Sequence, residues 1–465
     1  MIPLVALVIG LLGILGLFWL IREKRGTVSF AVWLPVVWLF ISSSRSLSSW
    51  LYGKFQQGAN YEEGSPLDRT FLMILIALGL FVVLKRSRKA SAILRLNLPI
   101  VLFLTYCLAS VLWSDFPVVT FKRWIRGAGD LVMILVFLTD PRRESALKWM
   151  LERIAFIHIP LSLIIIKYFP EFGRSYTYSG DPMWTGVSED KNGLGAILMI
   201  FGSTVLWRMM PTYCADQSRL RRMRGYFARS VVFAINLYLM SVIDSKTALI
   251  CALIAATLIL VPRLGGMFRR PALLSALVVV MVASCYAVLF LGIGTGALET
   301  MGRNASLTGR TEIWAVVIPL AVNPLLGAGY ENFWMGDRFA TVARELAVLN
   351  QAHNGYLETY LNLGWIGLLL LGGIVVTGYR NIMLQLRDNV EIASLKLAFF
   401  TVCLVYNFTE ATFKMTAPIW VAFLWACMAM PKPRAATLGS FTRDTVPDAV
   451  PAELNPLVSS AGPLI

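Results

Sequence analysis

Long apolar runs separated by short polar breaks constrain the fold of this chain more than any other feature. A helix that crosses the hydrocarbon core of a membrane needs about 20 consecutive, mainly apolar residues. The sequence holds about 13 such runs (12–14, because boundaries taken from sequence shift by about 2–4 residues). It therefore predicts an all-α, polytopic membrane protein. The runs lie near residues 2–21, 27–43, 70–84, 96–113, 121–139, 149–168, 193–210, 227–243, 247–262, 272–296, 362–379, 392–409 and 416–430.

The charged residues agree with a membrane protein and predict its orientation. Only 15% of the residues are charged, against roughly 25% in an average soluble protein. When the loops are sorted into two alternating sets, one set holds about two thirds of the lysines and arginines but only about a third of the acidic residues. Such loops stay cytoplasmic, which places the N-terminus outside and the C-terminus inside. Orientation thus accounts for the net charge of +15, and no nucleic-acid partner is expected.

The loops on the outer side are where chemistry is expected. The longest covers 297–361, and a loop of more than about 15 residues is usually functional or disordered. Its segment TEIWAVVIPLAV predicts a short amphipathic helix that stops at Asn323-Pro324, so we expect a small folded cap. The outer loops are 44–69, 114–118, 169–192, 244–246, 297–361 and 410–415. The predicted organisation is ten spans over 1–296, the cap over 297–361, three spans over 362–430 and a disordered cytoplasmic tail over 431–465.

The chain has two histidines, and their contexts differ. His158 lies within the apolar run AFIHIPLSLIII, which favours a packed or hydrogen-bonded core residue. His353 lies at the end of the long outer loop, where the chain re-enters the membrane. Because an imidazole titrates near neutral pH, His353 is a candidate to accept a proton from a hydroxyl. The alternative is a solvated or helix-capping residue. Asn354, beside it, is a candidate substrate contact.

Basic residues on the outer side oppose the orientation rule and call for an explanation. Arg310 precedes the predicted loop helix, where a guanidinium beside free backbone N–H groups suits a phosphate. Lys246 lies in a tight turn between two spans, and Lys191 lies where another span begins. Each lysine is a candidate phosphate ligand if it faces a shared cavity. Otherwise it is a side chain that extends to the membrane surface.

The fifth apolar run carries charges inside the membrane. Arg123, Arg126 and Asp130 are spaced at three and four residues, so they share one helix face, and Arg126 can pair with Asp130. A charge at mid-bilayer depth costs roughly 2.5–3.5 kcal/mol on insertion scales, so such residues tend to face a cavity. Arg123 and Arg126 are therefore candidate substrate ligands. For Asp130 a functional role and a structural pairing both stay open.

Several familiar motifs are missing from the sequence. It has no GxxxxGK[ST] loop, no GxGxxG after a strand, no HExxH, no DxD-type pair on an outer loop and no CxxC metal site. Nucleotide-driven transport and zinc proteolysis therefore find no support, and no metal is expected. An enzyme outside the membrane needs a substrate that is already activated, such as a lipid-diphosphate-linked sugar. Without metal ligands, its diphosphate leaving group would require arginine or lysine.

The residues just described also carry a family resemblance. The stretch from GRTEIW through NPLLGAGYENFW to AHNGYLETYLNLGWIGLLLLGGIV resembles the characteristic region of the O-antigen ligase and polysaccharide polymerase superfamily. The pieces WLFISSSRSLSSWL, WSDFPVVTFKRWIRGAGD and TGVSEDKNGLG are similar to the exopolysaccharide polymerase branch. The resemblance extends from about residue 38 to residue 370.

The resemblance implies a metal-independent, inverting glycosyltransferase of the bacterial inner membrane that uses no cofactor. Such enzymes transfer a glycan from undecaprenyl diphosphate to an acceptor hydroxyl on the periplasmic side. His353 corresponds to the loop histidine that activates the acceptor, and Arg310 to the loop arginine that faces the diphosphate. Lys246 replaces the arginine of a Ser-Arg-Thr turn, which keeps the charge but loses the bidentate geometry.

We therefore predict a polymerase of undecaprenyl-diphosphate-linked repeat units in exopolysaccharide or O-antigen biosynthesis. Its expected partners are the lipid-linked glycan, the bilayer, and other polysaccharide export and chain-length proteins. One alternative is an O-antigen ligase that transfers finished polymer to a lipid A core, which differs only in its acceptor. Another is a flippase or transporter for the same glycan, and a third is a scaffold of an export complex.

Overall fold

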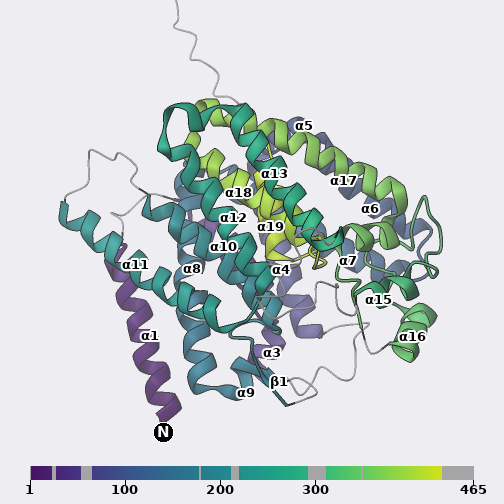
Figure 1. Ribbon diagram of the computed structural model, residues 1–465, viewed down its shortest axis with the longest axis horizontal. Helices are drawn as coiled ribbons and strands as arrows, with labels where there is room; N and C mark the ends of the chain where they lie inside the picture. The colour runs from purple at the N-terminus through teal and green to yellow at the C-terminus, as the bar shows by residue number, and fades with distance from the viewer. Residues whose placement is uncertain are drawn as a thin grey trace, which may run out of the picture. The chain divides into compact units, whose positions relative to one another are not determined.

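The computed structural model of the chain describes residues 2–22, 28–53, 65–176, 180–210, 219–291, 310–346 and 349–431. These residues are mostly helical and contain one short two-stranded sheet, which confirms the all-α prediction (Figure 1). The tail after 431, the basic residues at 24–25 and the long loop up to 309 lie outside the described residues.

The helices follow one another with short connections. The first nine are α1 (Ile2–Leu20), α2 (Trp33–Ser43), α3 (Leu47–Tyr52), α4 (Pro66–Lys85), α5 (Ser87–Leu96), α6 (Leu98–Ala109), α7 (Pro117–Leu138), α8 (Arg143–Tyr168) and α9 (Pro170–Gly173). The antiparallel strands β1 (Arg174–Tyr176) and β2 (Pro182–Trp184) follow. The other helices are α10 (Lys191–Met209), α11 (Arg219–Val242), α12 (Lys246–Leu260), α13 (Pro271–Phe290), α15 (Arg310–Val317), α16 (Gly336–Glu345), α17 (Gly355–Asp388), α18 (Val390–Tyr406) and α19 (Pro418–Cys427).

Seven described helices are long and apolar enough to cross a membrane, namely α1, α4, α8, α11, α12, α13 and α17. The pair α5 and α6 gives an eighth span if its two helices, which are bent by 93° at Asn97, count as one. Large apolar side chains are exposed along α1, α4 and α13, as expected of surfaces that face lipid. These features confirm a multi-pass membrane protein. The figure of about thirteen spans stays a prediction.

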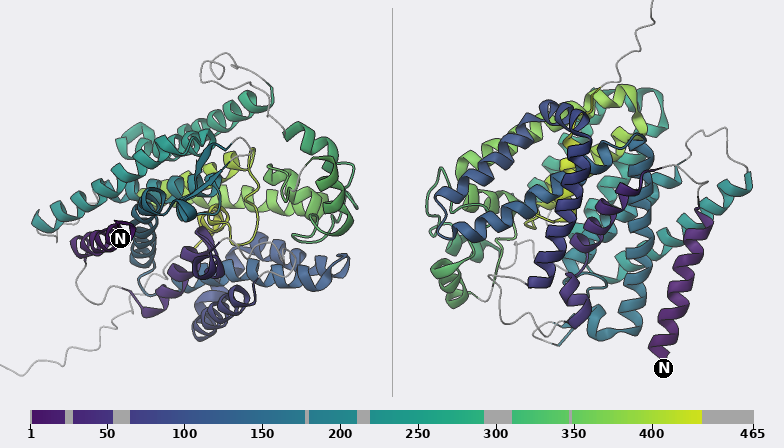
Figure 2. Two further views of the ribbon diagram at one scale, coloured as in Figure 1. Left: turned by 90° about the horizontal axis from the view of Figure 1, so that it is seen from below. Right: turned by 180° about the vertical axis from the view of Figure 1, so that it is seen from behind.

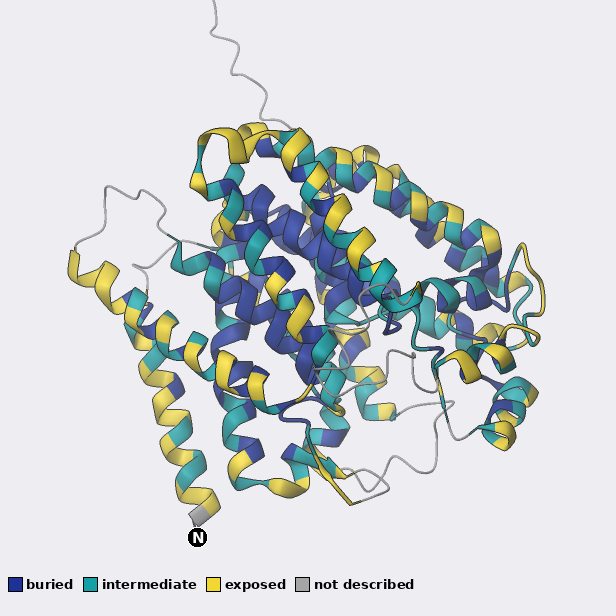
Figure 3. Cartoon of the chain, viewed as in Figure 1, coloured by how far each residue is buried: buried dark blue, intermediate teal, exposed yellow. Residues whose placement is uncertain are grey.

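The centre of the helical unit is formed by helices that are buried on almost every side. α18 is the clearest case, because nearly all of its residues from Ile392 to Tyr406 are buried (Figure 3). It packs against α12, α17 and α19. A helix that is apolar all round is typical of such a central position. α1 lies at the periphery, in contact with α8 and α11, and exposes most of its apolar residues (Figures 2 and 3).

The ends of helices that the sequence places on the outer side do meet in space. The C-terminal ends of α2 and α18 and the N-terminal ends of α4, α7, α10 and α19 line a common set of cavities. The first turn of α12 joins them, because the Thr247 and Thr409 hydroxyls are 3.2 Å apart. Arg338 of the long loop forms an ion pair with Asp115, 2.6 Å away, in the short turn before α7. Several loops that the charges assign to the outer side therefore lie close together, while their orientation in the membrane stays a prediction.

The described part of the long outer loop has a hydrophobic cluster of its own. α15 ends at Val317 and the chain continues through turns, so the helix stops before the expected Asn323-Pro324. α15 and α16 lie at the edge of the unit opposite to α1 (Figures 1 and 2). The buried members of the cluster are Ile313, Val317, Ala328, Phe333, Trp334, Val342, Ala352 and Leu361.

The start of α17 is fastened to this loop by backbone contacts. Ala328 N donates to Leu361 O and Trp365 N donates to Pro324 O, at 3.0 and 2.9 Å. Between them Gly364 has a φ of 64°, and a Cβ there would lie 2.2 Å from Leu325 O. Only glycine fits this combination of a left-handed φ and a close backbone approach. The kink therefore sets the angle at which the His353 end of α17 leaves the membrane-crossing part.

Candidate functional site

The turn between α18 and α19, here called the 407–417 loop, forms the floor of the site. Asn407 holds its first half, because the side-chain Oδ1 accepts hydrogen bonds from Thr412 N and Phe413 N at 2.8 and 3.2 Å. The backbone carbonyl of Asn407 accepts a hydrogen bond from Gly355 N at 2.9 Å. The loop is thereby tied to the first residue of α17, two positions after His353.

The second half of the loop is held by Asp130 of α7. The Asp130 carboxylate accepts hydrogen bonds from Thr416 N and from Trp38 Nε1, both at 2.8 Å. Thr416 has a φ of 57°, a left-handed conformation that this contact helps to fix. No ion pair joins Asp130 to Arg126 in the described structure, so the pairing that their spacing allows is not made. Two donors from other segments satisfy the carboxylate instead, so Asp130 has a structural role.

Glu410 is the point at which the candidate residues meet. Its Oε1 is 3.1 Å from Arg310 Nη2 and 3.1 Å from Asn192 Nδ2, and its Oε2 is 3.4 Å from His353 Nδ1. The Glu410 side chain is 8% exposed, whereas His353 and Arg310 are 24% and 22% exposed. A nearly buried carboxylate therefore holds a histidine and an arginine that stay accessible.

The segment before α17 fixes the position of His353. The Glu358 carboxylate accepts hydrogen bonds from Ala352 N at 2.9 Å and from Trp334 Nε1 at 2.5 Å. Trp314 Nε1 donates to Ala352 O at 2.8 Å, so the residue before His353 is bound on both sides. His353 itself has a φ of 49°, and Asn354 caps α17 by accepting from Tyr356 N and Leu357 N. Asn354 is thus a helix cap in the structure.

Four helix N-termini point toward Glu410 and its neighbours. Arg310 begins α15, Asn192 lies in the first turn of α10, and His353 precedes the N-cap of α17. The first turn of α12 comes close through Thr247, beside Thr409. The N-terminus of a helix carries a partial positive charge. Their convergence gives this region positive potential, which suits anionic groups.

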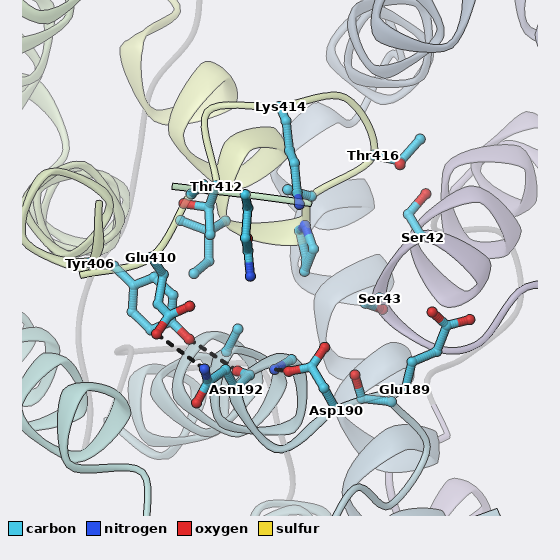
Figure 4. Close-up of a pocket in the computed structure, with 18 of the residues that line it drawn as sticks. Ser42, Ser43, Glu189, Asp190, Asn192, Tyr406, Glu410, Thr412, Lys414 and Thr416 are labelled. Atoms are coloured by element: carbon cyan, nitrogen blue, oxygen red, sulfur yellow. Dashed lines mark hydrogen bonds between the residues drawn. The ribbon is translucent and has the colours of Figure 1, made fainter. Parts of the chain in front are cut away.

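A polar cavity of about 290 Å³ opens beside Glu410. Figure 4 shows Lys414 extending into it from the 407–417 loop, with the carboxylates of Glu410, Asp190 and Glu189 around the opposite side. Burial, together with the neighbouring Asp190 charge, raises the pKa of Glu189 above its usual value. The wall of the polar cavity also includes hydroxyl and amide side chains, contributed by Ser42, Ser43, Ser44, Ser188, Asn192, Gln351, Tyr406, Thr412 and Thr416.

A larger, cationic cavity of about 1020 Å³ lies on the other side of the loop, between α4 and α7. Its wall combines apolar side chains of α4 and α7 with five basic residues, Arg69, Lys122, Arg123, Arg126 and Lys414. Glu331 is the acid on this wall; burial raises its pKa to about 7, although Lys414 acts in the opposite direction. A third cavity of about 320 Å³ shares Arg126 with the cationic cavity and Ser42 and Ser44 with the polar one.

The structure therefore groups the residues predicted from sequence in two places. His353 and Arg310 meet at Glu410, with Asn354 beside them as a cap. Arg123 and Arg126 line the cationic cavity, where Arg123 also donates to the Glu331 carbonyl. Lys191 and Lys246 begin α10 and α12 and are not among the residues that line the three cavities. In the described residues, no group of three His, Cys, Asp or Glu side chains is placed to hold a metal ion.

Sequence reasoning missed Glu410 and Lys414. Both lie in NFTEATFK, a short outer turn between two apolar runs. That context is a weak indication by itself, because charges at the ends of spans usually reach the membrane surface. Only the fold shows that this turn contacts the segment around His353, 57 residues earlier.

Replacing Gly355 with alanine is expected to destabilise the site. A Cβ at this position would lie 1.9 Å from Asn407 Oδ1, so the 407–417 loop must move or the start of α17 must shift. Such overpacking typically costs about 1–3 kcal/mol. We expect a lower thermal midpoint of the purified protein in detergent. Gly372→Ala is the matched control, because the same helix leaves open space there; equal midpoints for the two variants would contradict the prediction.

Comparison with known proteins agrees with the resemblance found in the sequence. Residues 230–372 match the O-antigen ligase family, and this segment contains Lys246, Arg310, His353 and Asn354. The chain is 25% identical over 339 residues to the exopolysaccharide production protein ExoQ of Rhizobium meliloti. That alignment covers 66% of this chain and 70% of the relative. The predicted resemblance to the O-antigen ligase and exopolysaccharide polymerase branch is confirmed, and it supports a membrane function of the polysaccharide polymerase or ligase type.

Proposed function

Because residues 230–372 match the O-antigen ligase family, we propose that the protein is a glycosyltransferase that polymerises undecaprenyl-diphosphate-linked repeat units. The reaction takes place on the periplasmic face of the bacterial inner membrane, in exopolysaccharide or O-antigen biosynthesis. The observation that carries the proposal is the His353–Glu410–Arg310 cluster, which is next to a polar cavity and shares its loop with a cationic one.

The cationic cavity suits a donor that is both anionic and lipid-linked. Its arginines and lysines outnumber its one acid, Glu331, and apolar residues of α4 and α7 form the rest of the wall. A diphosphate attached to a polyprenyl chain presents these same two chemistries. Arg123 and Arg126 bind the diphosphate in this arrangement, because an arginine fork suits phosphate oxygens.

The polar cavity suits the acceptor. Hydroxyl, amide and carboxylate groups line it, and these are the groups that hydrogen-bond to sugar hydroxyls. Glu410 lies in its wall and holds His353 Nδ1, which leaves Nε2 free to accept a proton. His353 therefore acts as the general base toward the acceptor hydroxyl.

The reaction is a single displacement with inversion, without metal or cofactor. The acceptor oxygen bonds to the anomeric carbon while the bond to the diphosphate oxygen breaks, and His353 takes the hydroxyl proton. Negative charge grows on the leaving phosphate, and cations stabilise it. Arg310, Lys191 and Lys246 supply further positive charge at the starts of α15, α10 and α12.

The remaining features of the proposal follow from the loop charges. The N-terminus is periplasmic and the C-terminus cytoplasmic, with ten spans before the loop of 297–361 and three after it. The loop forms a periplasmic cap that carries the catalytic motif. Other polysaccharide export and chain-length proteins are the proposed partners.

The location of glycan intermediates in cells lacking the protein tests this function. We expect single repeat units on undecaprenyl diphosphate, exposed to the periplasm and accessible to an added glycosidase. Restoring the native chain on a plasmid is the control. Single units that accumulate on the cytoplasmic face would show a flippase instead, and complete polymer that is not joined to a lipid core would show a ligase.

A further inference from the structure

Lys414 occupies a place that no other basic residue in the described structure shares. It lines the polar cavity and also the cationic cavity, since it projects from the loop that separates them (Figure 4). Its backbone lies between two fixed points, the Asn407 turn and the Asp130–Thr416 contact. The backbone position from which the side chain extends is therefore set by the fold.

The ammonium group of Lys414 has no hydrogen-bond or ion-pair partner among the described residues. This distinguishes it from Arg310, whose guanidinium is bound to Glu410, and from Arg123, which donates to the Glu331 carbonyl. Glu331 is the buried acid on which the Lys414 charge acts. A lysine that is positioned but not paired has its donors available for a substrate.

The proposed reaction fixes where charge must be stabilised. The anomeric carbon has the acceptor oxygen on one side and the departing diphosphate oxygen on the other. With the acceptor in the polar cavity and the lipid diphosphate in the cationic cavity, the breaking bond lies at the boundary between them. Resting on the proposed function, we infer that Lys414 is a catalytic residue whose ammonium contacts the departing phosphate oxygen.

This role differs from that of Arg126, which lines the cationic cavity but not the polar one. Arg126 holds the diphosphate before and during the reaction, so it binds the ground state and the transition state equally. Lys414 meets the oxygen on which negative charge grows, so its contribution rises in the transition state. Interactions that strengthen only in the transition state raise kcat, whereas uniform binding lowers KM. No proton passes to the phosphate in this step; Lys414 acts by its charge.

The test measures kcat and KM for a lipid-linked repeat unit with purified protein in nanodiscs. For Lys414→Ala we expect kcat to fall by about 10²–10³-fold, the usual loss of one donor to a developing anion. The KM for the donor should change little. Lys414→Arg should recover part of kcat because it restores the charge, and Lys414→Gln should not. For Arg126→Ala we expect the effect on KM instead: the KM for the donor rises, and kcat is largely kept.

Two controls separate this inference from the proposed function. Lys89→Ala removes an exposed positive charge on α5, outside the three cavities, and should keep the native kcat. Thermal midpoints of all variants identify any loss of folding, and the Arg and Gln variants decide the case if alanine unfolds the loop. A native kcat in Lys414→Ala or Lys414→Gln, with His353→Ala inactive, overturns the role of Lys414 alone. A fully active His353→Ala overturns the proposed function.

Discussion

Replacing His353 with alanine is expected to reduce glycan polymerisation by about 10²–10⁴-fold, the range that a general base contributes. The acceptor hydroxyl then keeps its proton as its oxygen approaches the anomeric carbon. Donor binding should persist, because Arg123 and Arg126 lie in a different cavity. The measurement is the rate of polymer formation from purified lipid-linked repeat units, normalised to folded protein.

The other histidine provides a matched control for this prediction. His158 is fully buried and hydrogen-bonds inside the helical unit, to Ser43 Oγ at 3.0 Å and to Ile154 O at 3.2 Å. His158→Gln should keep the native rate per folded molecule, even if the yield of protein falls. Normal polymer formation by His353→Ala, at native protein levels, would show that the imidazole takes no part in the chemistry.

Glu410→Gln is expected to be almost as damaging as the loss of His353. On the proposed mechanism, the carboxylate 3.4 Å away accepts from His353 Nδ1, so that Nε2 is the nitrogen that takes the acceptor proton. A glutamine amide can donate to Nδ1, which favours the other tautomer and places a proton on Nε2. The corresponding change from a carboxylate to an amide, aspartate to asparagine, costs about 10⁴-fold in a Ser-His-Asp triad. Here we expect a loss of about 10²-fold or more, because the contact is longer.

A double-mutant cycle shows whether Glu410 acts through His353. The losses should not add, so His353→Ala/Glu410→Gln should be about as slow as His353→Ala alone. Glu410→Gln also changes the contact between Glu410 and Arg310. Arg310→Lys, which removes the guanidinium, is the reference for the loss of that contact. Additive losses, measured in the same polymerisation assay, would mean that Glu410 acts independently of the imidazole.

The helical class could be predicted because it depends on local sequence, whereas the sidedness of the loops and the role of His353 stay predictions. Apolar length identifies spans, and alternating loop charge identifies their sides. Arg126 and Asp130 show the limit of local rules. Spacing of four residues makes them neighbours on α7, but Trp38 and Thr416 come from other segments and supply the hydrogen bonds.

Helix boundaries were harder to predict where the protein shields itself from lipid. α19 has only 10 residues and α18 has 17, yet both are largely buried and need not match the bilayer thickness. α17 begins before the predicted span at 362 and kinks at Gly364, where the loop backbone approaches it. Irregular backbone at such depth is tolerated when it is covered by protein or lines a cavity. Sequence alone does not show which segments cover such a backbone. Glu410 was missed for a related reason, because its contact with His353 joins residues that are far apart in the chain.

The contact between His353 and the 407–417 loop has a consequence for biosynthesis. A membrane protein is made from its N-terminus, so the histidine leaves the ribosome before the carboxylate that orients it. Glu410 reaches its position only when α18 and α19 have both entered the bilayer and Asp130 has bound Thr416. On the proposed mechanism, a chain halted at α18 holds the imidazole without its orienting partner. On that mechanism, activity begins only after insertion is complete.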